Sequence, residues 1–213
     1  MLNINFKYTL TSICFCSLLA CNKYEETKQI EKVVDWTNVN LNASTFRNGD
    51  TIKEVKSSQE LINATSLKFP AWCYYNFDSD NGSKYGKLYN LFAINDSRNI
   101  APNGFRIPND KDWSDLINKN GGISGAGLKM KSSSGWNNNG NGTNQSLFNG
   151  LPGGFYGNNY YQNVNKSGFW WSKSFDTTFN INSAYVLDFG NNAITHIGSN
   201  DLSAAYSVRC VKE

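Results

Sequence analysis

The chain of 213 residues contains a single histidine, His196. Zinc and non-haem iron sites built on histidine need two or more imidazole ligands, so this scarcity excludes histidine-rich metal centres. A Ser-His-Asp triad would have to use His196, and no Gly-x-Ser-x-Gly turn accompanies it. A lone histidine in a strand-like stretch is far more often structural than catalytic.

Charge is also scarce: charged residues make up only 17% of the chain, the net charge is +3, and like charges never run beyond a pair. Nucleic-acid-binding domains need clustered basic residues, so no nucleic-acid partner is expected. Gly121–Gly127 is glycine-rich but lacks the Lys-Ser/Thr ending of a phosphate-binding loop, and we interpret it as a turn. The acids Asp176, Asp188 and Asp201 lie in separate segments, so the sequence indicates no paired carboxylates. We therefore expect no catalytic residues and no cofactor.

Proline is rare too, with 4 residues against 18 glycines, whereas aromatic residues make up 14% of the chain. Asparagine accounts for about one residue in seven, well above ordinary usage. This composition is typical of a loop-rich exported β or α+β domain, and the aromatic content excludes a disordered chain.

The apolar run near the N-terminus is shorter than the roughly 20 residues that span a bilayer. It follows a basic residue, Lys7, and precedes small residues, which is the anatomy of a secretory signal. Leu18-Leu19-Ala20-Cys21 resembles the lipobox of bacterial lipoproteins, whose cysteine is acylated and becomes the new N-terminus. An ordinary signal peptide cut near Ala20 is the alternative. We expect a lipid on Cys21 that holds the mature chain on a membrane.

The expected organisation has three parts: a lipoprotein signal peptide at 1–20, a flexible polar tether at 21–32 and one domain at 33–213. The acidic pair Glu25-Glu26 resembles the surface-export signals of Bacteroidota lipoproteins. We expect a lipid-anchored protein of the cell envelope, at the outer membrane, with surface exposure as a further hypothesis.

Only Cys73 and Cys210 remain once the signal peptide and Cys21 are set aside. In an exported compartment a disulfide between them would close a loop of about 136 residues and stabilise the fold by at most ~4–5 kcal/mol. Two buried free thiols are the alternative, because free cysteine is commonly buried. The sequence leaves both open.

Helix signals are few and lie in the first half of the chain. Ser57 stands three residues before Glu60, a capping-box pattern that predicts a helix beginning there. Apolar spacing predicts a short helix at 89–95. A third helix is predicted after Asn109, which is followed by acids and a Trp-Leu-Ile stripe and is stopped by Gly121-Gly122.

The second half is predicted to form strands, at 168–172, 184–189, 193–197 and 205–211. Asn191-Asn192 predicts a hairpin turn, since asparagine tolerates positive φ, and short strands with tight turns favour antiparallel pairing. Ile123–Lys131 is interpreted as a linking strand, and 135–144 as a long polar loop.

A series of short motifs follows in a fixed order: residues 45–50 (TFRNGD), 70–76 (PAWCYYN), 85–90 (YGKLYN), 101–108 (APNGFRIP), 135–137 (GWN), 151–154 (LPGG), 168–172 (GFWWS) and 207–211 (SVRCV). Together they resemble the Fibrobacter succinogenes major paralogous domain family, found in exported proteins of Bacteroidota and Fibrobacterota. Phe105 and Arg106 stand where the family usually has Trp and His, and Ala101 where many members have Cys. That missing cysteine weakens any disulfide inferred from other members.

The family is in turn similar to the C-type-lectin-like superfamily. The resemblance implies an α+β fold with a small twisted antiparallel sheet, two or three short helices and long polar loops. Trp136-Asn137-Asn138 is close to the Trp-Asn-Asp triplet of sugar-binding C-type lectins but lacks the carboxylate. Amide oxygens alone make a weak calcium site, so no metal is expected. The fold also resembles that of formylglycine-generating enzymes, whose paired redox cysteines have only one counterpart here, Cys210.

Two polar segments, Trp136–Asn144 and Gly154–Asn163, interleave aromatic rings with amides, and we interpret both as loops. Rings stack on sugar faces and amides bond hydroxyls, so this mixture is typical of a carbohydrate surface. The predicted ligand residues are Trp136, Asn138, Tyr160 and Tyr161, and a core role for the rings is the alternative.

We therefore expect a non-catalytic binding module, for glycans or surface proteins. The alternatives are an exported enzyme of the formylglycine-generating type and a purely structural envelope or pilus-like component.

Overall fold

The computed structural model describes residues 35–213; the predicted signal peptide, Cys21 and the tether lie outside the described residues. The helices are α1 (Ser58–Ser66), α2 (Asp80–Tyr85), α3 (Leu91–Asn95), α4 (Asp110–Lys119) and α5 (Ala126–Met130), with a 3₁₀ turn at Tyr75–Phe77. The strands are β1 (Lys53–Glu54), β2 (Ala71–Cys73), β3 (Leu88–Asn90), β4 (Phe105–Arg106), β5 (Gly153–Gly157), β6 (Tyr160–Val164), β7 (Ser167–Asp176), β8 (Ile181–Asp188), β9 (Ile194–Ser199), β10 (Ala205–Tyr206) and β11 (Val211–Lys212).

The helices predicted to begin at Ser57 and Asn109 are confirmed together with their caps, and the short helix predicted at 89–95 is present over Leu91–Asn95, with residues 89–90 in β3. The Ser57 hydroxyl accepts a hydrogen bond from the Glu60 N–H at the start of α1. Asn109 and Asp112 form a reciprocal capping box at α4, satisfying two backbone donors that a helix start leaves free. The Asn90 side chain caps α3 by accepting from the Ala93 N–H. Polar side chains placed just before apolar stretches therefore set where these helices begin.

The linking strand predicted at Ile123–Lys131 is wrong, because this segment contains α5. Ala126 and Met130, four residues apart, are both buried on one side of the helix. Gly127 donates its N–H to the Asn192 carbonyl, and a Cβ at Gly127 would lie only 2.6 Å from that oxygen. The glycines that suggested a turn allow α5 to pack closely against the β8–β9 turn. Helix α2 was not predicted either.

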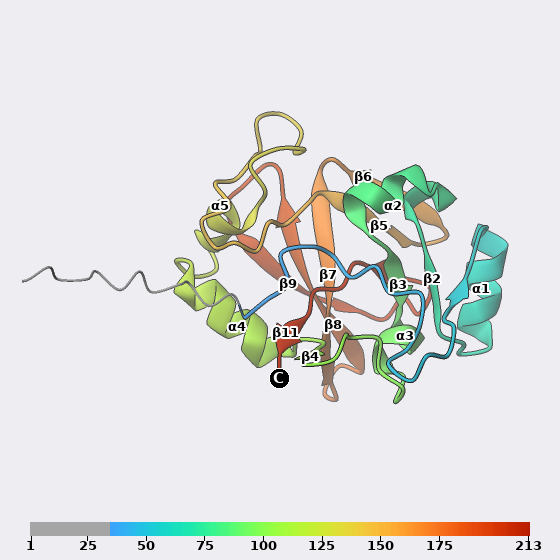
Figure 1. Cartoon of the computed structure of the whole chain (residues 1–213). Helices are drawn as coiled ribbons and strands as arrows, with labels where there is room; N and C mark the ends of the chain where they lie inside the picture. Colours follow the sequence, from blue (N-terminus) through green and yellow to red (C-terminus); the bar gives the residue numbers. More distant parts are fainter. Residues whose placement is uncertain (1–34) are drawn as a thin grey trace, which may run out of the picture. The chain divides into compact units, whose positions relative to one another are not determined.

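The main sheet has nine strands in the order β1-β2-β3-β10-β5-β7-β8-β9, with β6 paired to β5. β4 and β11 form a separate two-stranded ladder. Most pairings are antiparallel, but β1 with β2 and β5 with β7 are parallel. The predicted α+β class is confirmed. The expected sheet was small and antiparallel with two or three short helices, whereas the described residues form a nine-stranded, mainly antiparallel sheet and five α-helices. Figure 1 shows α4 and α5 on one side of β7–β9 and α1 beyond β2.

The second predicted loop, Gly154–Asn163, is instead the hairpin of β5 and β6. Its turn residues Asn158 and Asn159 have φ of 52° and 68°, which suits a two-residue hairpin turn. The amides that suggested an irregular loop serve this turn. By contrast, residues 132–149 contain no helix or strand, as predicted for the first loop.

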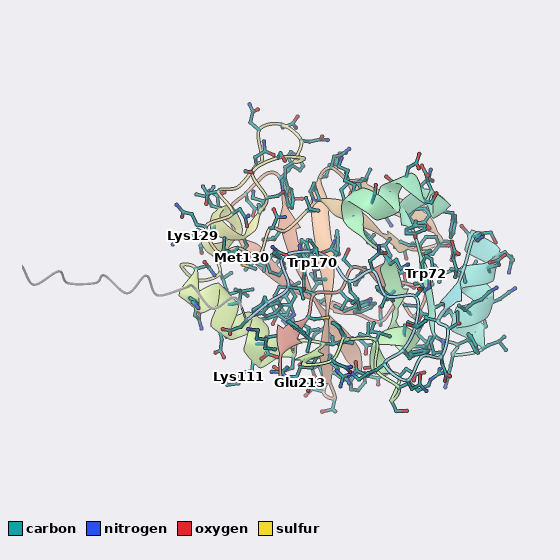
Figure 2. The ribbon with its side chains drawn as sticks, in the orientation of Figure 1. Trp72, Lys111, Lys129, Met130, Trp170 and Glu213 are labelled. Atoms are coloured by element: carbon teal, nitrogen blue, oxygen red, sulfur yellow. The ribbon has the colours of Figure 1, made fainter. Side chains whose placement is uncertain are left out.

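The core consists of three clusters, and neighbouring tryptophans of β7 contribute to two of them. Trp170, at the centre of Figure 2, packs with Trp113 of α4. Trp171 packs on the opposite side, near α3. The alternation follows from the pleat of a strand, which sends successive side chains to opposite faces. The third cluster lies between α1 and β2–β3 and contains Leu61 and Cys73. These clusters give residues 35–213 a core of their own.

The same alternation keeps the two thiols apart: of the two states that the sequence left open for Cys73 and Cys210, the structure has the buried free thiols and not the disulfide. Both cysteines are free and buried. Cys73 pairs with Leu88 and faces the third cluster, whereas the adjacent Trp72 packs in the first cluster together with Cys210. The β2–β3 ladder therefore separates the two sulfur atoms. Burial raises the pKa of each thiol to about 12.

Buried cations without a carboxylate partner brace the long loops. The Lys131 Nζ donates to the carbonyl oxygens of Asp188 and Asn191, at 3.1 and 2.8 Å, and lies 5.4 Å from the Trp136 ring centroid. The Lys87 Nζ donates to the Asn42 carbonyl at 2.9 Å. Desolvation lowers the pKa of both lysines. Backbone carbonyls and ring faces thus replace acids as partners of the buried charge.

Candidate ligand-binding groove

Trp136 is not a surface anchor, so its predicted role in ligand binding is wrong. Its side chain is only 5% exposed and belongs to the cluster around Trp170. The indole Nε1 donates to the Ser132 hydroxyl at 3.0 Å and to the Gly150 carbonyl at 3.2 Å. The two ends of the loop at 132–149 meet at this ring. The alternative interpretation, that Trp136 belongs to the core, is therefore the one that the structure supports.

The Tyr161 side chain also packs inside the protein and is not free to bind a ligand. Its ring is half-buried against Tyr75 and Phe77, at centroid distances of 4.9 and 5.0 Å. The Tyr161 hydroxyl donates to the Tyr74 carbonyl at 2.9 Å. Burial raises the pKa of this phenol strongly. Its hydrogen-bonding group is therefore already engaged inside the protein.

Tyr160 and Asn138 are the two predicted residues that remain at the surface. Tyr160 is 56% exposed at the β5–β6 turn, and Asn138 is exposed in the 132–149 loop. Trp136 and Tyr161, their neighbours in sequence, belong to different core clusters. The four predicted residues therefore do not form one site.

His196 lies beside serine and aspartate side chains, but their order does not match a catalytic triad. Asp110 is at the centre: its Oδ1 accepts from the Ser172 hydroxyl at 2.6 Å and its Oδ2 from the Ser183 hydroxyl at 3.0 Å. The His196 Nε2 lies 3.7 Å from the same Oδ2. A triad needs the imidazole between serine and aspartate, and both serines here are buried. The arrangement anchors the start of α4 to β7 and β8.

A surface groove of about 420 Å³ lies where the start of the described chain meets the end of the 132–149 loop. Ligand sites in proteins have volumes of this order. We call it the amide groove. Its lining residues are Trp36, Thr37, Asn38, Val39, Phe105, Asn144, Leu147 and Asn149.

None of these eight residues carries an ionisable side chain. Other cavities do contain one: Arg47 lines a second, Lys53 and Glu60 a third, and His196 a fourth. General acid–base chemistry needs a titratable group within hydrogen-bonding reach, and the lining of the amide groove contains no such group. It offers amides, one hydroxyl and apolar surface, which suit an uncharged ligand that is apolar in one part and hydrogen-bonding in another.

The outer wall of the amide groove has an unusual backbone. Asn144, Leu147 and Asn149 all have positive φ, of 50°, 63° and 52°. Asparagine tolerates this region, but for leucine it is strained and costs on the order of 1–3 kcal/mol. The strained turn leaves the Leu147 side chain partly exposed beside the groove. Strain retained at a cavity wall is typical of functional positions.

The buried Arg209 side chain bonds to both walls of the amide groove, the segment at 37–40 and the loop end at 149. Its buried guanidinium donates through Nη1 to the Thr37 carbonyl at 2.8 Å and through Nη2 to the Asn149 carbonyl at 2.9 Å. The Nε donates to the Asn40 side-chain oxygen at 2.8 Å. Burial lowers the pKa of Arg209 to about 9. One rigid fork thus fixes the segment at 37–40 relative to the loop end at 149.

An aromatic stack supports the floor of the amide groove. The Trp36 ring meets Trp113 edge to face at a centroid distance of 4.8 Å, and Phe148 at 5.9 Å. Phe148 in turn lies under the Arg209 guanidinium, 4.7 Å from it. The floor is thereby tied to the main core, so the groove is held in shape before any ligand arrives.

Sequence reasoning found one lining residue, Asn144, at the end of a predicted loop. It missed the segment around Asn38, which was expected only to begin the domain, and it missed Phe105. The available signal was the clustering of asparagine and apolar residues at both 36–39 and 144–149. Nothing in the sequence indicates that these segments meet, because Arg209, which bonds to both, is remote from them along the chain.

In the described part of the chain, no group of three or more His, Cys, Asp or Glu side chains is placed to hold a metal ion. No helix within residues 35–213 is long and apolar enough to span a membrane.

The fold and groove define an α+β domain with a preformed, uncharged surface cavity. The chain belongs to the Fibrobacter succinogenes major domain family, whose model matches residues 33–212. No curated protein and no solved structure matches the chain.

Proposed function

We propose that this protein is a lipid-anchored module of the bacterial cell envelope that binds a neutral glycan in the amide groove and catalyses no reaction. The observation that supports this most is the lining: exposed apolar surface from Val39 and Leu147 beside three asparagine side chains, with no ionisable group. Sugars present apolar ring faces and hydroxyls, and this lining offers a partner for each. We further propose that the domain is C-type-lectin-like, as the order of its motifs suggests.

The amides are partly free to bind a ligand. The Asn144 Oδ1 accepts from the Asn149 N–H at 2.8 Å, and the Asn149 Nδ2 donates only a long bond of 3.4 Å to the Asn38 carbonyl. An amide offers two donors and an acceptor with two lone pairs. Hydroxyls of a neutral sugar can therefore replace water on these groups without an unpaired charge being buried.

The cysteines argue against the formylglycine-generating alternative. A redox pair needs sulfur atoms that approach each other and reach the thiolate state. Here burial raises the pKa of both thiols to about 12, and a ladder of the sheet lies between them. This supports a binding role over thiol chemistry.

The experiment is an array of envelope and host glycans, neutral and anionic, probed with the soluble chain from Asn22 to Glu213. We expect binding to neutral glycans. Val39→Asp places a carboxylate beside the groove at a position that is 63% exposed, so folding should be unaffected. It should lower affinity by tenfold or more, about 1.4 kcal/mol.

Phe179→Asp is the matched control, since Phe179 is 71% exposed on the β7–β8 turn and does not line the groove. It should leave glycan affinity unchanged. Binding confined to anionic glycans, or equal loss in both variants, would contradict the proposal. Capture of a surface protein with no glycan binding would favour the protein-ligand alternative.

A further inference from the structure

Strand β9 forms an edge of the main sheet without the usual protection. It pairs with β8 on one side, and no strand among residues 35–213 pairs with its other side. Natural edge strands are shielded by charges, prolines or bulges. The sequence of β9, Ile194-Thr195-His196-Ile197-Gly198-Ser199, contains no acid, lysine, arginine or proline, and its pairing with β8 is regular. An edge of this kind is a ready template for another strand.

The free backbone groups of this edge can be identified. The Ile194 N–H donates to the Ile123 carbonyl, so residue 194 points away from β8. Backbone groups alternate in direction along a strand. The N–H and C=O of His196 and Gly198 therefore point outward as well.

The β7–β8 ladder gives an independent check. The Trp171 N–H donates to the Ser207 carbonyl, on the side of β7 away from β8. The backbone N–H and C=O groups of the even-numbered residues of β7 therefore point toward β8. Gly168 and Trp170 pair with Leu187 and Tyr185, which turns Val186 of β8 toward β9. Val186 pairs with Thr195, so the backbone groups of odd-numbered residues of β9 point toward β8 and those of even-numbered residues point to the free edge. Both routes agree.

We propose that this edge pairs with the same edge of a second copy of the chain, antiparallel and two-fold symmetric, with Ile197 on the axis. In that register His196 of each copy lies opposite Gly198 of the other. Each such pair exchanges two N–H···O=C bonds, so the ladder contains four.

The side chains are self-complementary in this register. Ile197 meets its own symmetry mate, apolar against apolar. His196 lies opposite Gly198, so no side chain of the facing residue stands against the imidazole, although Ile181 of β8 covers the Gly198 Cα. This match within β9 itself is why the occupant is a second copy.

Neighbouring registers fit less well. An axis at His196 would place two imidazoles opposite each other and would require the outward N–H of Ile194, which Ile123 already occupies. An axis at Gly198 would pair His196 with Asn200, beyond the end of β9. The axis at Ile197 needs only the outward backbone groups of His196 and Gly198.

Cross-linking tests the register directly. In the proposed ladder Ile197 forms a non-hydrogen-bonded pair with its mate, with Cα atoms about 4.5 Å apart, within disulfide range. Ile197→Cys in the chain from Asn22 to Glu213 should therefore give a covalent dimer on mild oxidation. Cys73 and Cys210 should not interfere, because both are buried with pKa values raised to about 12.

Thr195→Cys is the matched control, on the same face of the same strand. Its mate would lie four residues away along the ladder, roughly 13 Å, too far for a disulfide. Cross-linking of Thr195→Cys as readily as Ile197→Cys would overturn the proposed register.

Self-association of the unmodified chain is measured by sedimentation equilibrium up to about 1 mM, the weak end of measurable affinity. We expect a monomer–dimer equilibrium that His196→Pro weakens at least tenfold. Proline at this position removes an outward N–H and no N–H of the β8 ladder, so that ladder should be retained. It also removes the imidazole beside Asp110 and Tyr185, whereas His196→Ala removes the imidazole alone and should leave the dimer intact. A monomer at every concentration, or a dimer unaffected by His196→Pro, would overturn the proposal. A strand captured from a different protein by a monomeric chain would overturn it equally.

Discussion

Arg209 and Asn149 are joined by a hydrogen bond of 2.9 Å, from the buried guanidinium Nη2 to the backbone carbonyl oxygen. The bond links the segment before the last strand to a residue of the amide groove. Because the same guanidinium also binds the Thr37 carbonyl, both walls of the groove depend on one side chain. The groove is thus a property of the core and not of a free loop.

Replacing Arg209 should destabilise the fold strongly. Arg209→Met leaves the Thr37 and Asn149 carbonyls without this donor and breaks the bond to the Asn40 Oδ1, which keeps the Trp170 indole N–H. We expect a loss of about 3–5 kcal/mol in the free energy of unfolding. Chemical denaturation measures it. Arg98→Met is the control, since Arg98 pairs with Asp50 and Asp96 near the surface, and its replacement should cost much less. Similar losses in the two variants would contradict this account of Arg209.

Trp136 and Tyr160 should respond in opposite ways to truncation. Trp136→Ala opens a cavity in the core and should cost about 3–5 kcal/mol of stability. Tyr160→Ala, at an exposed turn position, should change stability by about 0.5 kcal/mol or less. Thermal unfolding of the two variants side by side checks this. A mild effect of Trp136→Ala would revive its predicted surface role.

Stability should fall at alkaline pH, partly through the two thiols. Each has an unfolded-state pKa near 9.0 and a folded-state pKa raised to about 12 by burial. Above pH 9 the unfolded chain releases these protons while the folded chain keeps them, so stability is lost as pH rises. Between pH 8 and pH 10 each thiol should account for about 1.4 kcal/mol of the loss.

The double variant Cys73→Ala, Cys210→Ala separates this effect from that of the tyrosines. Burial also raises the pKa of Tyr89 and Tyr206, so those phenols contribute a loss of the same sign in both proteins. Urea unfolding at the two pH values should show a decline smaller by about 3 kcal/mol in the variant. An identical decline would mean that the thiols ionise in the folded protein.

Anchoring depends on Cys21, which lies outside the described residues. If the Leu18-Leu19-Ala20-Cys21 motif directs acylation, Cys21→Ser should move the protein from the membrane fraction to the soluble fraction. Labelled fatty acid incorporated into the variant would show that the lipid is attached elsewhere. Protease added to intact cells would then test surface exposure of the unmodified protein.

Local signals in the sequence predicted much of the fold. Asn109 as a cap and the Asn191-Asn192 turn depend only on nearby residues, and both the helix and the hairpin are present. The parallel pairing of β5 with β7 could not be predicted in this way, because no local signal fixes which distant strands lie side by side. The burial of Trp136 could not be predicted either, because it depends on how the loop folds to bring Ser132 and Gly150 to the indole N–H.

The candidate site was harder to predict than the fold. Asn38 and Asn149 come together because the buried Arg209 binds carbonyls from both segments. An arginine in a polar stretch gives no sign in the sequence that it will be buried. The state of Cys73 and Cys210 stayed open in the sequence for a related reason, since the face that Cys73 takes depends on the register of β2.

The central claim is that the amide groove holds the ligand, and NMR shift mapping tests it most directly. The ¹⁵N-labelled chain is titrated with a neutral oligosaccharide selected on the array. The side-chain amide signals of Asn38, Asn144 and Asn149 should shift together, with little change at the β5–β6 turn. Shifts centred on Asn158, Asn159 and Tyr160, or no shift at the three groove amides, would contradict the account.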